Sequence, residues 1–338
     1  MKILHYKESN NFLPSKRILK AIIDQERIFL ECDFNTTSDL KDDFDVVYVN
    51  NLSIQARRAI RKLKSQGYPI VYQGNSNSEN FRNTVRFSNL FSGLYRRFIM
   101  SSYSLADAII VPTQHNKNML RSYGLTQIID VIPSPIDMKR FAYDATKVEE
   151  FREYFQLPVG QSLVIGSGHA FERKGILDFL SVARAMPDIT FIWFGEADSK
   201  ALPGKVTKAL SQASANVIIA GHIEGRIYEG ALSAADVYFY PTYEDAEVDN
   251  VIEAMASTTQ VILRDIEVYR PWLSDSESCY KGDTNEDFVT LIRDSILGKI
   301  TGTQQAAYKI ASGYTYEMCG KLMKRTFEKV LEEDSNEH

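Results

Sequence analysis

The sequence YEDAEVDNVIEAMA, at residues 243–256, follows the apolar run 237–241 and leads into an expected helix. Two of its acids, Asp245 and Glu253, are eight positions apart, the first in a loop and the second in the first turns of that helix. Carboxylates accept strong hydrogen bonds from ligand hydroxyls, and a helix N-terminus favours a negatively charged group such as a phosphate. Acids are also common in solvated loops and in first helical turns. The segment therefore predicts a strand, a loop and a helix that can hold a polyhydroxylated ligand. The surrounding sequence must decide whether the two acids form such a ligand site or are ordinary solvated acids.

Short apolar runs rich in β-branched and aromatic residues alternate with helical patterns along the whole chain. Such alternation predicts parallel sheets with helices on both faces, in which ligands bind beyond the carboxyl ends of the strands. The pattern breaks near residues 134–145 and then starts again, so we expect two doubly wound domains. The expected strands are 2–6, 28–33, 45–50, 70–73, 108–112 and 128–133 in the first domain, and 162–166, 190–195, 216–221, 237–241 and 260–264 in the second.

Length and composition exclude several classes of protein. The chain has 338 residues, enough for two domains, and its 44% hydrophobic and 25% charged residues are globular values. No apolar run is long enough to cross a membrane, and the first residues lack the apolar core of a signal peptide. The three cysteines are far apart and predict a reducing compartment. Neither they nor the five histidines have metal-ligand spacing, so no metal is expected.

The net charge of −5 conceals a basic segment at residues 57–97, which holds nine basic residues and one acid, a local charge of +8. A concentrated basic surface on an acidic protein predicts contact with a polyanion, either a membrane or a nucleic acid. The basic residues of this segment are Arg57, Arg58, Arg61, Lys62, Lys64, Arg82, Arg86, Arg96 and Arg97.

Two helical patterns favour the membrane. Residues 53–66 place small and aliphatic side chains on one side and the cations opposite, and residues 81–100 gather an apolar face that includes Phe87 and Phe91, with arginines at its edges. An apolar face with basic flanks is typical of an interfacial helix, and each cation near an anionic leaflet contributes ~1 kcal/mol. A core helix with a solvated basic face is the alternative. No nucleic-acid-binding motif accompanies the charge, so we expect no nucleic acid partner.

A turn of small residues ends at Gly168, after the first strand of the second domain, and Arg173-Lys174-Gly175 opens the next helix. Small residues let the backbone approach a ligand closely. Two cations at a helix start oppose the helix dipole, so the pair indicates an anionic ligand such as a diphosphate, with a solvated Arg-Lys pair as the alternative. The spacing differs from that of a P-loop, and no Ser or Thr follows the lysine.

These motifs, taken in order, resemble the family 4 retaining glycosyltransferases of the GT-B fold. The resemblance covers nearly the whole chain. Within the family, residues 78–84 and 264–269 look most like those of bacterial glycosyltransferases that act on diacylglycerol or glucosyl-diacylglycerol. The segments that carry the family resemblance are 102–113, 131–141, 164–168, 172–175, 191–195, 216–221, 235–237 and the acid pair with seven residues between its two members.

The resemblance implies an α/β fold with two doubly wound Rossmann-like domains that face each other across an interdomain cleft. It implies an acceptor and membrane-side domain at 1–141, a nucleotide-sugar-binding domain at 142–313, and a C-terminal helix at 314–338 that packs back toward the first domain. The enzyme is then expected to be cytoplasmic and peripheral at the inner face of the cell membrane. It would move glucose or galactose from UDP-glucose or UDP-galactose to a lipid acceptor on an anionic membrane surface, without a metal or other cofactor.

Family roles transfer onto matching positions of this chain. Arg173 and Lys174 would hold the donor diphosphate and stabilise its charge as it departs. Asp245 would accept hydrogen bonds from the donor sugar, and Glu253 would bind the ribose. The family is thought to use same-face attack by the acceptor, so no protein nucleophile is expected. The full set of expected donor-binding residues is Gly168, Arg173, Lys174, Asp245, Glu247, Val248 and Glu253.

Four positions depart from the family pattern. Asp245 replaces a glutamate, Val248 replaces a common glycine, and residues 15–20 lack the usual glycine-rich loop. Asn75 stands where the family has a histidine close to the reacting sugar, and an asparagine cannot titrate near neutral pH. Two alternatives to a lipid hexosyltransferase therefore stay open: a catalytically inactive GT-B subunit that binds lipid or a partner glycosyltransferase, and a soluble transferase that acts on a glycan or a protein.

Overall fold

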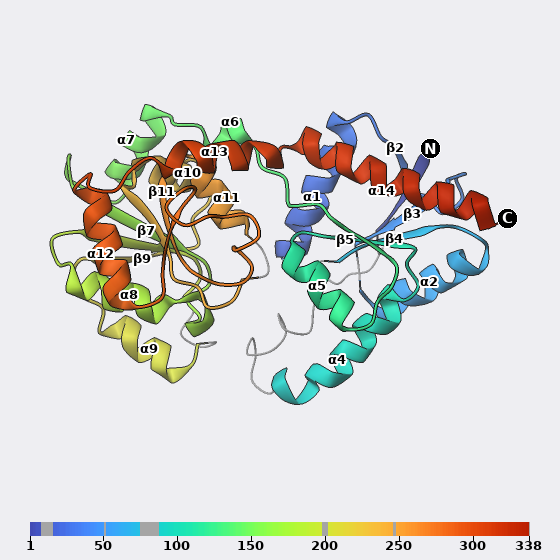
Figure 1. Ribbon diagram of the computed structural model, residues 1–338, viewed down its shortest axis with the longest axis horizontal. Helices are drawn as coiled ribbons and strands as arrows, with labels where there is room; N and C mark the ends of the chain where they lie inside the picture. Colours follow the sequence, from blue (N-terminus) through green and yellow to red (C-terminus); the bar gives the residue numbers. More distant parts are fainter. Residues whose placement is uncertain (8–15, 51, 75–87, 198–201, 246–247, 338) are drawn as a thin grey trace. The chain divides into compact units, whose positions relative to one another are not determined.

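The computed structural model describes residues 1–7, 16–50, 52–74, 88–197, 202–245 and 248–337 (Figure 1). The chain divides into two compact units, Met1–Pro135 together with Tyr314–His338, and Ile136–Gly313. The first boundary lies six residues before the expected one at 141, because helix α6 (Met138–Phe141) packs with the second unit. Phe141 is buried there, and the side chain of Arg140 forms an ion pair with Glu229.

The first unit contains a six-stranded parallel sheet in the order β2-β1-β3-β4-β5-β6. The predicted strand at 28–33 is wrong, because these residues end helix α1 (Lys16–Glu31) and the strand follows at 35–37. Ile28 and Phe29 are buried on a helix face one turn after the buried Gln25, which is helical spacing. The strands are β1 (Lys2–Tyr6), β2 (Asn35–Thr37), β3 (Val46–Val49), β4 (Ile70–Gln73), β5 (Ala108–Val111) and β6 (Ile128–Val131).

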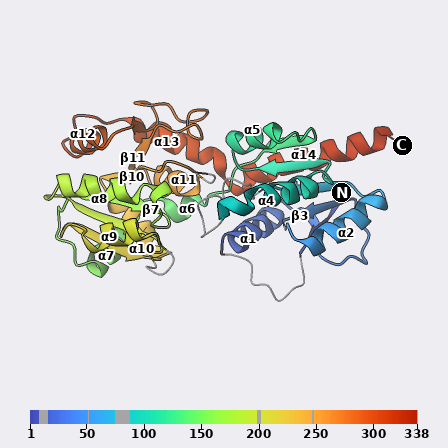
Figure 2. The ribbon, with the colours of Figure 1, turned by 90° about the horizontal axis from the view of Figure 1, so that it is seen from below.

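Helices cover both faces of this sheet (Figures 1 and 2). On one face α1 packs with the last helix, α14 (Tyr316–Glu337), around buried side chains that include Phe29 and Phe327. The segment after Tyr314 therefore completes the core of the first unit, although it is last in the sequence. The opposite face is covered by α2 (Ile54–Ser65), α4 (Ser88–Tyr103) and α5 (Gln114–Ser122).

The second unit contains another six-stranded parallel sheet, in the order β12-β11-β10-β7-β8-β9. The five strands predicted in this half are present, and the three-residue β12 was missed. From β7 the sheet continues to β8 and β9 in one direction, and from β10 it continues to β11 and β12 in the opposite direction. The neighbours β7 and β10 therefore form the switch point at which doubly wound sheets bind ligands. The strands are β7 (Leu163–Ser167), β8 (Thr190–Phe194), β9 (Val217–Gly221), β10 (Val237–Tyr240), β11 (Gln260–Arg264) and β12 (Tyr280–Gly282).

An aromatic core fixes this second sheet against its helices. Phe179 packs edge-to-face on Trp193 and is stacked on Phe239, and Phe239 contacts Phe288. The rings therefore tie β8 and β10 to two helices on one face, α8 and α12. The helices of the unit, besides α6, are α7 (Ala145–Tyr154), α8 (Ile176–Ala185), α9 (Gly204–Ser211), α10 (Arg226–Ala234), α11 (Asp249–Ala256), α12 (Asn285–Ile296) and α13 (Thr303–Ala311), and a 3-10 turn, η1, spans Glu172–Lys174.

Candidate active site

The backbone after β7 is held in a conformation that requires glycine. Gly168 has a φ of +125°, and its amide donates to Phe194 O at 2.8 Å. Its carbonyl accepts from Trp193 Nε1, also at 2.8 Å. A Cβ on Gly195 would lie only 2.0 Å from this carbonyl. Two glycines therefore bring the carboxyl ends of β7 and β8 into direct contact.

The Arg-Lys turn is joined to the loop that follows β10. Gly175 has a φ of +80°, and a Cβ there would lie 2.3 Å from Pro241 O. The carbonyl of Arg173 accepts from Tyr243 N at 2.9 Å and from Thr242 Oγ1 at 3.1 Å. The predicted phosphate turn and the predicted sugar loop are therefore one packed structure at the switch point of the sheet.

Lys174 makes the central contact of this structure. Its Nζ donates to Asp245 Oδ1 and to Tyr240 Oη, each at 2.7 Å. The side chain of Lys174 is 15% exposed and that of Asp245 is 2% exposed. Next to it, Arg173 Nε is buried and has no hydrogen-bond partner among the described residues. A buried donor of this kind is costly unless a ligand satisfies it, so the turn is suited to an anion.

Two tyrosines complete the surroundings of Asp245, and the sequence did not identify either as a site residue. Tyr269, in the loop after β11, donates from Oη to Asp245 Oδ2 at 3.0 Å. Burial raises the pKa of Tyr240 to about 12 and that of Tyr269 well above its usual value, so both hydroxyls keep their protons at neutral pH. Burial alone would lower the pKa of Lys174, but Asp245 and Tyr240 outweigh it and raise that pKa.

A second layer holds the loop from outside. Arg264, at the end of β11, is buried, and its Nε donates to Pro241 O at 3.2 Å. Its Nη2 lies 3.5 Å from Asp178 Oδ2, on α8. These contacts connect the ends of β10 and β11 to the first turn of α8.

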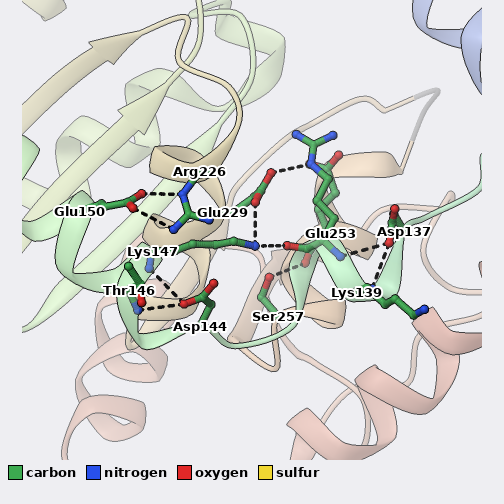
Figure 3. A network of polar contacts seen from close by, with 11 residues as sticks. Asp137, Lys139, Asp144, Thr146, Lys147, Glu150, Arg226, Glu229, Glu253 and Ser257 are labelled. Atoms are coloured by element: carbon green, nitrogen blue, oxygen red, sulfur yellow. Dashed lines mark hydrogen bonds and ion pairs between the residues drawn. The ribbon is translucent and has the colours of Figure 1, made fainter.

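Glu253 belongs to a neighbouring polar network (Figure 3). At its centre is the buried Glu229 of α10. Its Oε1 accepts from Arg140 Nε at 2.6 Å, and its Oε2 lies 2.9 Å from Lys147 Nζ. Burial alone would lower the pKa of Arg140, but Glu229 and, more weakly, Glu253 raise it. Glu253 on α11 is half-buried, and its carbonyl accepts from Ser257 Oγ at 3.0 Å. The second acid of the pair therefore lies close to a cation of α6.

Comparisons with known proteins identify the family. The model described as Glycosyltransferase Family 4 matches residues 4–140. A processive diacylglycerol alpha-glucosyltransferase of Acholeplasma laidlawii is 34% identical over 332 residues, which cover 98% of this chain and 99% of that protein. The chain belongs to glycosyltransferase family 4. An alpha-galactosylglucosyldiacylglycerol synthase of Streptococcus pneumoniae is 22% identical over 192 residues, 55% of this chain and 51% of that protein.

Solved structures identify the fold. Anabaena Alr3699/HepE in complex with UDP-glucose superposes with a TM-score of 0.73 at 14% identity, over 97% of this chain and 100% of that one. Sucrose-phosphate synthase of Thermosynechococcus elongatus superposes with a TM-score of 0.71 at 15% identity, over 96% and 81% of the two chains. At these identities the likeness establishes the fold alone. The predicted GT-B fold, with two doubly wound Rossmann-like units, is confirmed.

One departure from the family 4 pattern has a structural explanation. Val248 is 4% exposed and directly precedes α11 with a φ of −103°, a conformation that a branched residue can adopt. Its carbonyl accepts from Val251 N and Ile252 N, so it begins the helix without needing a glycine. Two other predicted site residues, Asn75 and Glu247, lie outside the described residues.

The predicted membrane-binding residues of this glycosyltransferase divide into three groups. On α2 the apolar side, with Ala56, Ile60 and Leu63, is buried, and Ile60 and Leu63 pack in the core of the first unit. The interpretation of residues 53–66 as an interfacial helix is therefore wrong, and α2 is a core helix with a basic outer face on which Arg57 is half-buried. Lys64 forms an ion pair with Asp107. The exposed cations are Arg58, Arg61, Lys62 and Lys64 on α2, and Arg96 and Arg97 on α4. Arg82, Arg86 and Phe87 lie outside the described residues, as does the side chain of Phe91.

No group of three or more His, Cys, Asp or Glu side chains among the described residues is arranged to hold a metal ion. No helix in the same part of this glycosyltransferase is both long and apolar enough to span a membrane. The expectation of a metal-free reaction stays a prediction.

Proposed function

We propose that this glycosyltransferase moves a glucosyl residue from UDP-glucose to the free glycerol hydroxyl of diacylglycerol or to a sugar hydroxyl of glucosyl-diacylglycerol, with retention of configuration. The observation that carries the proposal is the 34% identity to a diacylglycerol alpha-glucosyltransferase over nearly the full length of both chains. The polar site at the end of β7 and β10 agrees with it, because it offers two partly buried cations to a diphosphate. UDP-galactose is the second candidate donor, favoured by the similarity to the galactosyl-lipid synthase of S. pneumoniae.

The chemistry proposed for the donor site is electrostatic. Arg173 and Lys174 bind the diphosphate and stabilise the negative charge that grows on it as the bond to the anomeric carbon breaks. The acceptor oxygen bonds to that carbon on the face from which UDP leaves, and its proton passes to the departing phosphate. Glu253 accepts hydrogen bonds from the ribose hydroxyls, and Gly168 lets the backbone approach the donor. Two cations supply the charge that a divalent metal would otherwise supply, so we propose that none is needed.

The lipid acceptor requires a membrane, and we propose that the protein acts as a peripheral enzyme at the inner face of the cell membrane. The exposed cations of α2 and α4 support this step. Anionic lipids attract such cations with ~1 kcal/mol each, and the attraction is lost within a Debye length. No nucleic acid partner is proposed, because no binding motif for one accompanies the charge.

The test is a vesicle assay. Vesicles of phosphatidylglycerol that contain diacylglycerol or glucosyl-diacylglycerol are incubated with the protein and with radiolabelled UDP-glucose or UDP-galactose, and lipid products are separated chromatographically. We expect acceptor-dependent label in the lipid fraction with UDP-glucose. Lys174→Met should reduce it by roughly 10²–10³-fold, whereas Lys205→Met, which removes an exposed lysine paired with Glu172, should not.

Three outcomes would contradict the proposal in different ways. Absence of labelled lipid with both donors would exclude both lipid acceptors. Failure of the protein to float with anionic vesicles, combined with label in an added glycan or protein, would favour a soluble transferase. Absence of UDP-sugar binding by calorimetry would favour an inactive subunit.

A further inference from the structure

Protein donors surround the carboxylate of Asp245. Its Oδ1 accepts from Lys174 Nζ at 2.7 Å and its Oδ2 accepts from Tyr269 Oη at 3.0 Å. The side chain is 2% exposed. A ligand hydroxyl takes the place of water when it binds, and water has almost no access to this group. The carboxylate is therefore placed to act on Lys174 more directly than on a sugar.

We propose that Asp245 is a positioning residue that fixes the ammonium of Lys174 against the donor diphosphate, and that Tyr269 orients Asp245 for this purpose. The inference rests on the proposed function, because it assumes a nucleotide diphosphate as the ligand. It assigns a different role to the first acid of the pair than direct contact with the sugar.

The need for positioning follows from the side chain of Lys174. A lysine carries its charge on a flexible four-carbon stem, and holding it in one conformation costs rotamer entropy. Asp245 and Tyr240 accept two of its three N–H donors and so limit it to one geometry. The third donor is left for a phosphate oxygen. Asp245 also keeps the ammonium protonated, because burial alone would lower the pKa of Lys174.

The short side chain at position 245 fits this role. An aspartate is one methylene shorter than the family glutamate, so its carboxylate stays close to its own loop. Tyr269 reaches it there from the loop after β11 and is itself fully buried. The hydroxyl of Tyr269 keeps its proton at neutral pH, so it acts as a donor to the carboxylate.

Calorimetry with two ligands separates positioning from sugar contact. UDP has the diphosphate and lacks the sugar, whereas UDP-glucose has both. Asp245→Asn keeps the shape and removes the charge. If Asp245 acts through Lys174, this change should weaken UDP and UDP-glucose by the same factor, about tenfold for the loss of a charge-assisted hydrogen bond. An unchanged affinity for UDP with a weakened affinity for UDP-glucose would overturn the inference, because only a direct sugar contact gives that result.

A double-mutant cycle tests the route of the effect. In a Lys174→Met background, Asp245→Asn should change UDP affinity by less than twofold, and an undiminished tenfold loss would show that Asp245 acts independently of Lys174. Tyr269→Phe tests the same route with no change of charge, and should weaken UDP and UDP-glucose equally. Its control is Tyr280→Phe, which removes a buried hydroxyl that donates to Thr301 O at 3.2 Å, outside the site. If Tyr269→Phe had no more effect than Tyr280→Phe, Tyr269 would have no positioning role.

The outcomes for the acceptor and for Asp245 are distinguishable. UDP binding needs no lipid, so a protein that bound UDP and labelled no lipid would contradict the proposed function while the comparison of the two ligands still decided the role of Asp245. A wild-type protein that bound neither UDP nor UDP-glucose would overturn both.

Discussion

The guanidinium of Arg264 lies over the ring of Tyr243, with its Cζ 4.0 Å from the ring centroid. The same guanidinium donates to Pro241 O and to Asp283 O and faces Asp178. Tyr243 itself is half exposed. One buried cation at the end of β11 therefore holds the loop that leads to Asp245 next to α8 and to the residue that follows β12.

Arg264→Met should destabilise the protein and reduce turnover together. The substitution keeps an apolar stem, leaves two carbonyls without their donor and removes the cation next to Asp178, which costs about 3–5 kcal/mol in the free energy of unfolding. Because the loop loses its support, the kcat for glucosyl transfer should fall by more than the folded fraction accounts for. Urea denaturation and the vesicle assay on the same preparation measure both effects. Arg270→Met is the control, since Arg270 is exposed and pairs with Asp265 on the same loop segment; equal losses in the two variants would contradict the role of Arg264.

The sequence predicted that Lys174 and Asp245 serve one donor site, but not the ion pair between them. Both follow strands of one parallel sheet, and β7 and β10 turn out to be neighbours, so residues just beyond them meet at one edge. The contribution of Tyr269 was not predictable in the same way. A tyrosine in an apolar context is normally a core residue, and only the turn after β11 decides that its hydroxyl reaches a carboxylate.

The errors in the predicted strands have the same kind of cause. Residues 28–33 were predicted as a strand because Ile28, Phe29 and Leu30 form an apolar run. Two of these side chains are buried against α14, a helix nearly 300 positions later in the chain, and Leu30 is 80% exposed. The apolar run alone does not show that Leu30 is exposed, because the contact with α14 decides which side chains of the run are buried. The missed strand β12 has three residues, too few for an alternation to be visible.

Glu229→Gln should lower the free energy of unfolding at neutral pH, and the loss should be smaller at acid pH. Burial alone would raise the pKa of Glu229, but Lys147 and Arg140 outweigh it and hold that pKa below its ordinary value of 4.5. A carboxyl whose folded-state pKa is lowered stabilises the protein above its unfolded-state pKa, and this contribution is lost as the pH falls through the folded-state pKa.

The measurement is urea denaturation of wild type and Glu229→Gln at pH 7 and at several values below 4.5. We expect a difference of about 3 kcal/mol at pH 7, because a buried ion pair loses one partner, and a difference that narrows as the pH falls. Glu150→Gln is a control, since its ion pair with Arg226 is on the surface. A difference between wild type and Glu229→Gln that stayed constant with pH would show that the charge of Glu229 contributes nothing.

Removal of divalent metals should leave glucosyl transfer unchanged. Arg173 and Lys174 supply the positive charge at the proposed diphosphate site, so the leaving group has its counter-ions without a metal. The vesicle assay with excess EDTA and with added Mg²⁺ or Mn²⁺ measures this directly. Activity that disappeared with EDTA and returned with either metal would require a metal-dependent mechanism.

Replacing the exposed cations of α2 should weaken membrane binding selectively. The triple change of Arg58, Arg61 and Lys62 to Ser should reduce binding to phosphatidylglycerol vesicles by roughly 1 kcal/mol per cation at low salt, and should not alter UDP affinity. The matched control changes Lys321, Lys324 and Arg325 of α14, three exposed cations on another helix of the same unit, to Ser. Flotation assays at two salt concentrations compare the variants. Equal loss of vesicle binding in the two triple variants would mean that binding depends on net charge alone and that α2 is not the membrane-binding surface.

Val248→Gly restores the residue common in the family, and we expect it to make this protein less stable without making it more active. Val248 is 4% exposed, so removal of its side chain would leave a small cavity. Its φ is negative, so the backbone gains no relief of strain from a glycine, and the added freedom would loosen the first turn of α11. The expected loss in the free energy of unfolding is about 1–3 kcal/mol, from the buried methyl groups and the added backbone freedom. Turnover in the vesicle assay should not rise, because Val248 already allows the backbone to begin the helix.

Ala231→Gly, at a buried site on α10, serves as a control for the general effect of a glycine in the second unit. A clear gain in turnover for Val248→Gly would show instead that the branched side chain obstructs the donor.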